Sequence, residues 1–144
     1  NGIDSQLLSF EMTLPQIRDV SKAVPAEVLI YGRLPLMVME NCVMKNRTGT
    51  CSCQTTQTKL IDRMGEEFPI VKDPGTCRNV LLNGKKLYLL DKKDVFRGMG
   101  LWALRLSFTT ENPGEIDTIL YQYHTGGVFD AGSYTRGLYS RGVE

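Results

Sequence analysis

Four cysteines are the side chains of this sequence that could do chemistry as a group. Cys42, Cys51 and Cys53 lie within twelve positions, and Cys77 follows after a gap of 23 residues. Four thiolates are the number of ligands that a tetrahedral zinc ion or an iron–sulfur cluster requires. The spacing differs from the paired CxxC motifs of zinc ribbons, so it does not choose between these metals. The residues predict one metal centre bound by all four sulfurs.

Three other roles for these cysteines stay open at this point. Two disulfides satisfy the count, although a domain of this size can bury a core without such staples. Free buried thiols are common for isolated cysteines but fit a polar loop poorly. A nucleophilic or redox thiol needs a base, and the only histidine, His124, is far away in the sequence. Cationic side chains near the cysteines could offset thiolate charge, namely Lys45, Arg47 and Lys59.

Composition places the chain among ordinary globular proteins. Its 144 residues suit one domain, and its 17 basic and 16 acidic side chains nearly cancel. No global field therefore attracts nucleic acid or an anionic membrane, and no apolar run is long enough to span a bilayer. We expect a cytoplasmic protein. Because the chain begins with Asn1 instead of Met, we interpret it as a piece of a longer polypeptide, whose remainder is its expected partner.

The elements that must position these residues begin with a predicted strand, helix and strand. Residues 6–12 and 27–32 have the apolar composition of buried strands. Between them, Thr13 and Gln16 form a capping-box pattern for a helix over 14–24, which Pro25 ends. The pattern indicates a βαβ unit.

Functional groups of βαβ units gather beyond the carboxyl ends of the strands. Those positions are Glu11, at the carboxyl end of the first predicted strand, and Arg33, after the second. A carboxylate and a guanidinium there could meet an acidic or peptidic substrate, so both are candidate catalytic residues. The alternative is a salt bridge that closes the end of the sheet.

The section from Leu34 to Leu90 has no sustained helical period and holds all four cysteines. The runs "TKLID" and "EFPIV" on either side of "RMGE" predict a β-hairpin, and Asn83-Gly84 predicts a turn between two further apolar runs. We therefore expect a compact, mostly β insertion.

The remaining residues predict a helix, a strand and a second helix. Asp91 can cap a short helix that ends near Arg97, and 101–108 alternates as a strand with an apolar face of Trp102, Leu104, Leu106 and Phe108. Asn112 begins a helix that ends near His124, with core positions at Ile116, Ile119, Leu120 and Tyr123. The glycine-rich tail predicts no element. The predicted fold is thus mixed α/β, a single fragment over 1–144 composed of segments 1–33, 34–90 and 91–144.

Four runs of this sequence resemble, in order, the later part of the collagenase-like peptidases of unknown catalytic type, the peptidase group called U-thirty-two. They are "VLIYGRLPLMVMENC", "LIDRMGEEFPIVKD", "TCRNVLLN" and "YTRGLYSRGV". The resemblance spans nearly the whole chain. It implies that the βαβ unit is the end of a barrel-like α/β domain, that the source is bacterial, and that the whole protein is a peptidase acting on collagen-like peptides.

Other members of this family hydroxylate RNA or a small aromatic ring and bind a [4Fe–4S] cluster through four cysteines. The resemblance implies that Cys42, a cysteine of the 51–53 region and Cys77 are three such ligands. Relatives carry the fourth cysteine where this chain has Pro35, and Cys53 could supply that sulfur instead. This altered ligand set slightly favours zinc over the cluster. Relatives also read Thr-Arg-Gly-His where this chain ends the same motif with Leu138.

Three functions follow as hypotheses. The chain is a piece of a collagenase-like peptidase with a structural or redox metal centre, an iron–sulfur enzyme that modifies RNA or a small aromatic compound, or a non-catalytic, zinc-stabilised interaction domain. The sequence contains no HExxH motif and no nucleophile elbow, and four-cysteine sites are normally closed to substrate. Three arginines could bind phosphate, balance the sulfurs or simply be solvated: Arg63, Arg78 and Arg136.

Overall fold

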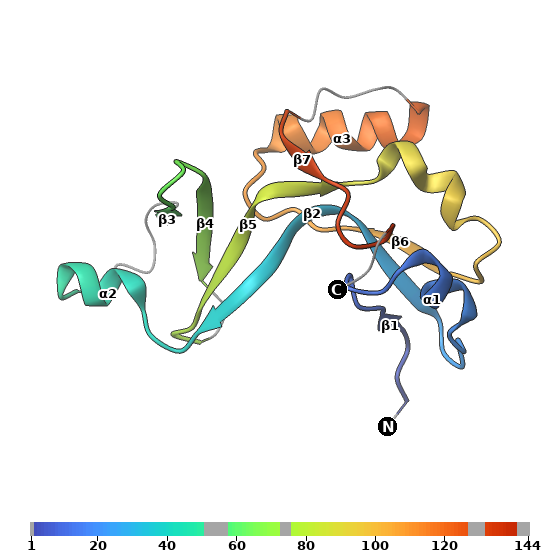
Figure 1. Ribbon diagram of the computed structural model, residues 1–144, viewed down its shortest axis with the longest axis horizontal. Coiled ribbons are helices and arrows are strands. Elements are labelled where there is room, and N and C mark those ends of the chain that lie inside the picture. The colour runs from blue at the N-terminus through green and yellow to red at the C-terminus, as the bar shows by residue number, and fades with distance from the viewer. Residues whose placement is uncertain (1, 51–57, 73–75, 127–131, 141–144) are drawn as a thin grey trace. The chain divides into compact units, whose positions relative to one another are not determined.

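The computed structural model describes residues 2–50, 58–72, 76–126 and 132–140. These residues form a mixed α/β fold, as expected, in which strands predominate over a few helices (Figure 1). In chain order the elements are β1 (Gln6–Leu7), α1 (Leu14–Asp19), β2 (Ala26–Met39), α2 (Val43–Thr48), β3 (Thr58–Ile61), β4 (Glu67–Lys72), β5 (Asn79–Tyr88), the 3-10 helix η1 (Leu90–Phe96), β6 (Ala103–Leu106), α3 (Pro113–Thr125) and β7 (Tyr134–Thr135).

The chain divides into two compact units. Unit 1 consists of Asn1–Gly32 and Lys86–Glu144, and unit 2 consists of Arg33–Lys85. Two neighbouring strands, β2 and β5, each contribute residues to both units. Unit 2 is therefore an insertion in the sequence of unit 1, and it contains all four cysteines.

Unit 1 is built on parallel strands. β1 and β6 each pair in parallel with β2, and β7 pairs in parallel with β5. Every residue of β2 from Ala26 to Gly32 is buried, as expected for a strand covered on both faces. The most deeply buried large side chains of this core are Ile17, Val28, Ile30, Tyr31, Leu87, Ile119 and Tyr139.

Helix α1 begins where the sequence predicts, but it is shorter. Thr13 and Gln16 form the expected capping box, with the Thr13 N–H donating to Gln16 Oε1 over 2.8 Å. The helix ends at Asp19 instead of residue 24, since the backbone is already extended at Val20, with ψ 136°; Lys22 Nζ donates to the carbonyl oxygen of Ile17, at 2.6 Å, in the last turn.

Helix α3 has the predicted limits. Asn112 and Glu115 form a capping box, and Gly126 ends the helix in a left-handed conformation with φ 73°. Ile119 is buried as predicted, whereas Leu120 is 38% exposed, so its assignment to the core was wrong. The helix presents a narrower apolar stripe than the sequence predicted.

Unit 2 contains the predicted hairpin. β3 and β4 are antiparallel, with Thr58 opposite Ile70, and Asp62 Oδ1 accepts hydrogen bonds from the N–H groups of Met64 and Glu66 in the loop. β4 continues the sheet by pairing antiparallel with β5. The short helix α2 was not predicted.

The predicted turn at Asn83-Gly84 was wrong, because both residues lie inside the continuous strand β5. The glycine serves close packing there instead of a turn. A Cβ atom at Gly84 would lie 2.5 Å from Glu66 Oε1 and 2.8 Å from the carbonyl oxygen of Glu67. Only glycine lets the neighbouring segment approach this strand so closely.

The segment after β5 also differs from expectation. Residues 90–96 form a 3-10 helix whose N-cap is Leu89, and Asp91 does not cap it but pairs with Arg136. Strand β6 is shorter than the predicted 101–108, and Trp102 is 67% exposed instead of sharing its apolar face.

The glycine-rich tail is tied to the core of unit 1. Arg136 Nη1 donates to the carbonyl oxygen of Tyr88 at 2.9 Å, and Arg136 Nη2 donates to Asp91 Oδ2 at 2.9 Å. Tyr139 is 2% exposed, and its hydroxyl donates to the carbonyl oxygen of Leu29 at 2.7 Å. Burial raises the pKa of Tyr139 to about 12.

Among the described residues, helices that are both long and apolar enough to cross a bilayer are absent.

We expect Tyr139→Phe to lower the free energy of unfolding by about 1–2 kcal/mol, because the variant leaves a buried carbonyl oxygen without its donor. Urea denaturation measures this difference. Tyr121→Phe is the matched control, since Tyr121 is 70% exposed. The folded-state pKa lies above the ordinary 10.0, so the Tyr139 contribution is complete below pH 10 and is lost as the pH rises toward 12. Equal stability of the two variants at neutral pH would contradict this role.

Candidate functional site

Two of the four cysteines lie in described parts of unit 2. Cys42 is half-buried at the N-cap of α2, Cys77 is exposed just before β5, and both are free thiols. Asn79, which is 7% exposed, connects their surroundings, because its Oδ1 accepts a hydrogen bond from the N–H of Val43 at 2.9 Å. A hydrogen bond thus joins Val43, which follows Cys42, to Asn79, which lies two positions after Cys77.

A second contact joins the same two segments. Arg78 Nε lies 2.9 Å from Glu40 Oε1, with both side chains largely exposed. Surface ion pairs of this kind contribute little free energy, so the buried Asn79 side chain is the stronger tie. Together the two contacts hold the chain around Cys42 beside the chain around Cys77.

The other predicted ligands, Cys51 and Cys53, lie outside the described residues. Within the described ranges, groups of three or more Cys, His, Asp or Glu side chains that could bind a metal ion were not found. The described half of the site consists of two thiols on neighbouring segments. Thiolate is the ligand type that both zinc and iron–sulfur clusters take, so these donors fit such a group.

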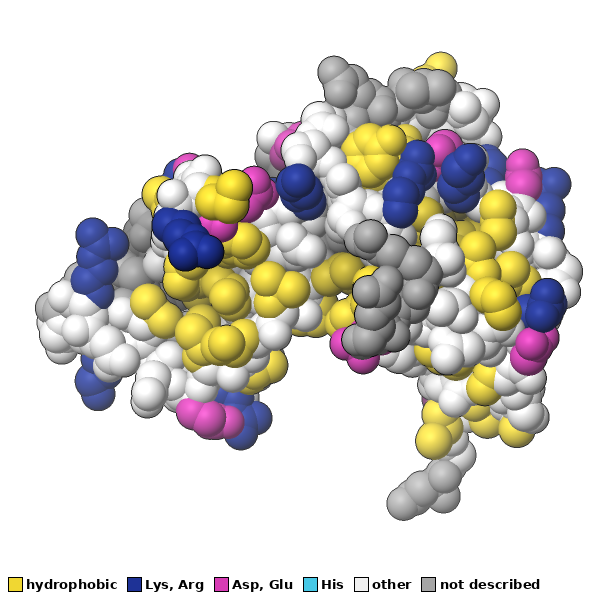
Figure 2. Space-filling view, in the orientation of Figure 1, with side chains coloured by type: hydrophobic (Ala, Val, Ile, Leu, Met, Phe, Trp, Pro, Cys, Tyr) yellow, Lys and Arg dark blue, Asp and Glu magenta, His cyan; other side chains and the backbone are white. Residues whose placement is uncertain are grey.

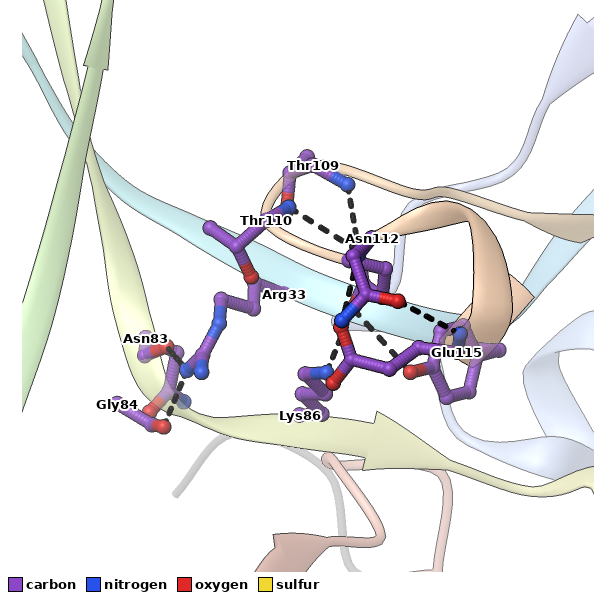
Figure 3. Close-up of polar contacts among 10 residues, drawn as sticks. Arg33, Asn83, Gly84, Lys86, Thr109, Thr110, Asn112 and Glu115 are labelled. Carbon is purple, nitrogen blue, oxygen red and sulfur yellow. Dashed lines mark hydrogen bonds and ion pairs between the residues drawn. The ribbon is translucent and has the colours of Figure 1, made fainter. Parts of the chain in front are cut away.

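The two predicted catalytic residues have different surroundings. Glu11 is exposed in the turn between β1 and α1, four residues beyond the end of β1, and it belongs to unit 1. Arg33 belongs to unit 2 and lies within β2, not after it, so its predicted place at a strand end was wrong. Its Nη1 donates to the carbonyl oxygen of Asn83 at 2.9 Å and also to that of Gly84 (Figure 3). Arg33 therefore ties β2 to β5 within unit 2.

The sequence did not reveal that Glu111 is an enclosed charged group of unit 1. Its side chain is fully buried, and Lys86 Nζ lies 2.9 Å from its Oε1 (Figure 3). The Tyr31 hydroxyl donates to the same oxygen at 3.2 Å, while Oε2 accepts from the N–H groups of Thr109 and Thr110. The carboxylate thus fixes the loop between β6 and α3.

The electrostatics of Glu111 follow from these contacts. Burial favours the protonated acid, but the hydrogen bond from Lys86 and those from the backbone outweigh it and hold the pKa of Glu111 below its ordinary value of 4.5. Glu27, in β2, is a second buried carboxylate, and hydrogen bonds from Ser5 and Arg105 lower its pKa. Both groups are charged at neutral pH and bind their own partners.

The arginines singled out in the sequence have separate surroundings. Arg136 holds the tail of unit 1 through Asp91, Arg78 pairs with Glu40, and Arg63 is exposed in the β3–β4 loop. The first two are therefore engaged by carboxylates. Only Arg78 lies directly beside a cysteine in sequence.

Comparisons with known proteins returned nothing: no family model matches the chain, and neither does any curated protein or solved structure.

We expect Glu111→Gln to lower the free energy of unfolding at neutral pH by about 1–3 kcal/mol, because it removes the charge that Lys86 and two backbone N–H groups surround. Glu115→Gln is the matched control, since glutamine keeps the acceptor of the capping box. Urea denaturation gives both values.

The difference in unfolding free energy between the wild type and Glu111→Gln should shrink as the pH falls. Because the folded-state pKa of Glu111 is lowered, its contribution is complete above the ordinary value of 4.5 and is lost as the pH falls through the folded-state pKa. The wild type should therefore lose its advantage over Glu111→Gln in acid. A gap that stays constant or widens below pH 4.5 would rule out the assigned role.

Proposed function

We propose that Cys42, Cys51, Cys53 and Cys77 bind one metal centre, and that this centre stabilises unit 2 as a module within a larger α/β protein. The observation that carries the proposal is the hydrogen bond from the Val43 N–H to the buried Asn79 side chain, which joins the surroundings of Cys42 and Cys77. Two thiols 35 positions apart in the sequence are thereby supported by neighbouring backbone segments. A bound metal would supply the cross-link that these segments are arranged to accept.

The small core of unit 2 supports a structural role for the metal. The described buried residues of this unit are Leu34, Asn79 and Leu82. Units of about 50 residues bury little surface and are only marginally stable by themselves, and a bound metal commonly adds stability to them. Zinc is favoured because a closed four-thiolate site suits structure. A [4Fe–4S] cluster is the alternative, and it would add electron transfer.

An exposed apolar surface favours interaction as the second function of unit 2. Hydrophobic side chains gather over its strands (Figure 2), and large ones that are about half or more exposed are Leu36, Met37, Val38, Leu60, Ile61 and Met64. Large apolar side chains that gather on the surface of a soluble protein often meet another surface. A zinc-stabilised interaction module accounts for both the cysteines and this surface.

The relation to collagenase-like peptidases is part of the same proposal. In that family the parallel pairing of β1 with β2 would be the end of a barrel-like domain, and unit 2 would be the insertion that follows it. A catalytic role for Arg33 gains no support, since two carbonyl oxygens of β5 engage its guanidinium. We therefore assign hydrolysis, or modification of RNA or a small aromatic compound, to the whole protein and not to these residues alone.

We expect the chain purified without air to carry one metal centre, identified by elemental analysis and a visible spectrum. One colourless zinc ion per chain supports the structural site, whereas iron with sulfide and broad visible absorption supports the cluster. Replacing any one of the four cysteines by serine should release the metal. Metal-free protein with a folded unit 2 would contradict the proposal.

Asn79→Ala should weaken metal binding by about tenfold or more, because residues that orient ligands commonly contribute that much. Competition with a chromophoric chelator measures the affinity. Asn83→Ala, on the same strand, is the matched control, and Asn79→Asp should restore part of the affinity because it keeps the acceptor oxygen. Equal metal affinities for the Asn79→Ala and Asn83→Ala proteins would show that the hydrogen bond between Val43 and Asn79 does not support metal binding.

A further inference from the structure

Unit 1 contains a pocket whose described lining residues include none of the cysteines and neither predicted catalytic residue. It lies where α3 ends, near η1, with which α3 packs, and at the amino-terminal end of β6. Its volume is about 790 Å³, which falls within the usual range for small-molecule sites of about 300–1,000 Å³. Its lining includes Lys93, Arg97, Trp102, Tyr123 and His124.

The charged groups of this pocket have one sign. Lys93 and Arg97 line it together with the imidazole of His124, and none of the described lining residues is Asp or Glu. Arg97 pairs with Asp94 at 3.1 Å, but both side chains are more than 70% exposed. An exposed pair of this kind is weak, so Arg97 can leave Asp94 for an anionic ligand.

Lys93 is already held in position at the wall of the pocket. Its Nζ donates to the carbonyl oxygen of Tyr123 at 2.7 Å and lies 5.2 Å from the centre of the Tyr123 ring. An ammonium group has three donors, so this bond leaves further donors for a ligand. The aromatic contact fixes the cation without neutralising its charge.

Trp102 adds a flat aromatic surface. It is the only tryptophan of the chain, and it is 67% exposed although its backbone N–H is bonded to the carbonyl oxygen of Ala26 at 2.8 Å. The backbone is therefore fixed in unit 1 while the indole ring borders the pocket. Exposing so large an apolar ring is costly, and stacking against a planar ligand would recover that free energy.

We propose that this pocket binds a small planar aromatic anion, of which a nucleoside monophosphate is the model compound. The ring of the ligand stacks on Trp102, and its anionic group is bound by Arg97 and Lys93. The ligand needs both an aromatic ring and an anionic group. The pocket offers the exposed indole of Trp102 for the ring and cations for the anion, and its described lining contains no carboxylate. This site is independent of the metal centre proposed for unit 2.

The test is calorimetric titration of the full chain with adenosine monophosphate, adenosine and inorganic phosphate. We expect the monophosphate to bind saturably and at least about tenfold more tightly than either adenosine or phosphate, since each of these supplies one half of the interaction. Quenching of the single tryptophan should follow the same isotherm. Failure of the monophosphate to bind, or binding no tighter than that of phosphate, overturns the proposal.

Matched variants locate the site. Trp102→Leu should weaken monophosphate binding by at least about fivefold, whereas Tyr121→Leu, at a tyrosine 70% exposed outside the pocket, should not change it. Arg97→Gln should weaken it by about tenfold. Arg18→Gln is its control, because Arg18 is also exposed and paired with a neighbouring aspartate. Monophosphate affinity that is unchanged in both pocket variants assigns binding elsewhere and overturns the proposal.

Discussion

The stability of unit 2 is limited by its small buried core. Its described residues bury few side chains, and one of them, Asn79, is polar. A buried amide must be hydrogen-bonded, and Asn79 meets this need by accepting from the first N–H of α2. The polar group that could have weakened the unit instead connects the start of α2 to the start of β5. A metal bound by thiols beside this connection would add the stability that the apolar core lacks.

Unit 1, by contrast, buries many apolar side chains. Residues 26–32 of its strand β2 are all buried, and Tyr139 from the tail closes the core from a distant part of the sequence. The buried Glu111 carboxylate is tolerated because Lys86 and backbone donors surround it. Unit 1 is thus stable through packing, which leaves the exposed Trp102 available for another role.

Local sequence rules predicted the parts of the fold that local interactions determine. The capping boxes at Thr13 and Asn112 join residues three positions apart, and the pairs of the hairpin over 58–72 are 6 to 12 positions apart. Prediction failed where a distant contact decides the conformation. Gly84 looked like part of a turn because Asn-Gly usually is one, but the approach of Glu66 to the strand explains the glycine.

In the candidate sites, too, residue types could be read from the sequence, whereas contacts between distant residues could not. Cysteine spacing identified Cys42 and Cys77 as possible ligands, since residue type alone reveals a thiol. It could not identify Asn79, whose role depends on a bond across 36 positions. Glu111 was missed for the same reason, because a glutamate before a helix cap reads as an ordinary polar loop residue until Lys86 and Tyr31 are placed beside it.

The most direct test of the central claim is amide hydrogen exchange, measured along the chain with the metal bound and after its removal by a chelator. We expect metal removal to accelerate exchange in Arg33–Lys85 and to leave residues 26–32 of unit 1 protected. Unchanged protection in Arg33–Lys85 would contradict the claim, as would an equal loss of protection in both units.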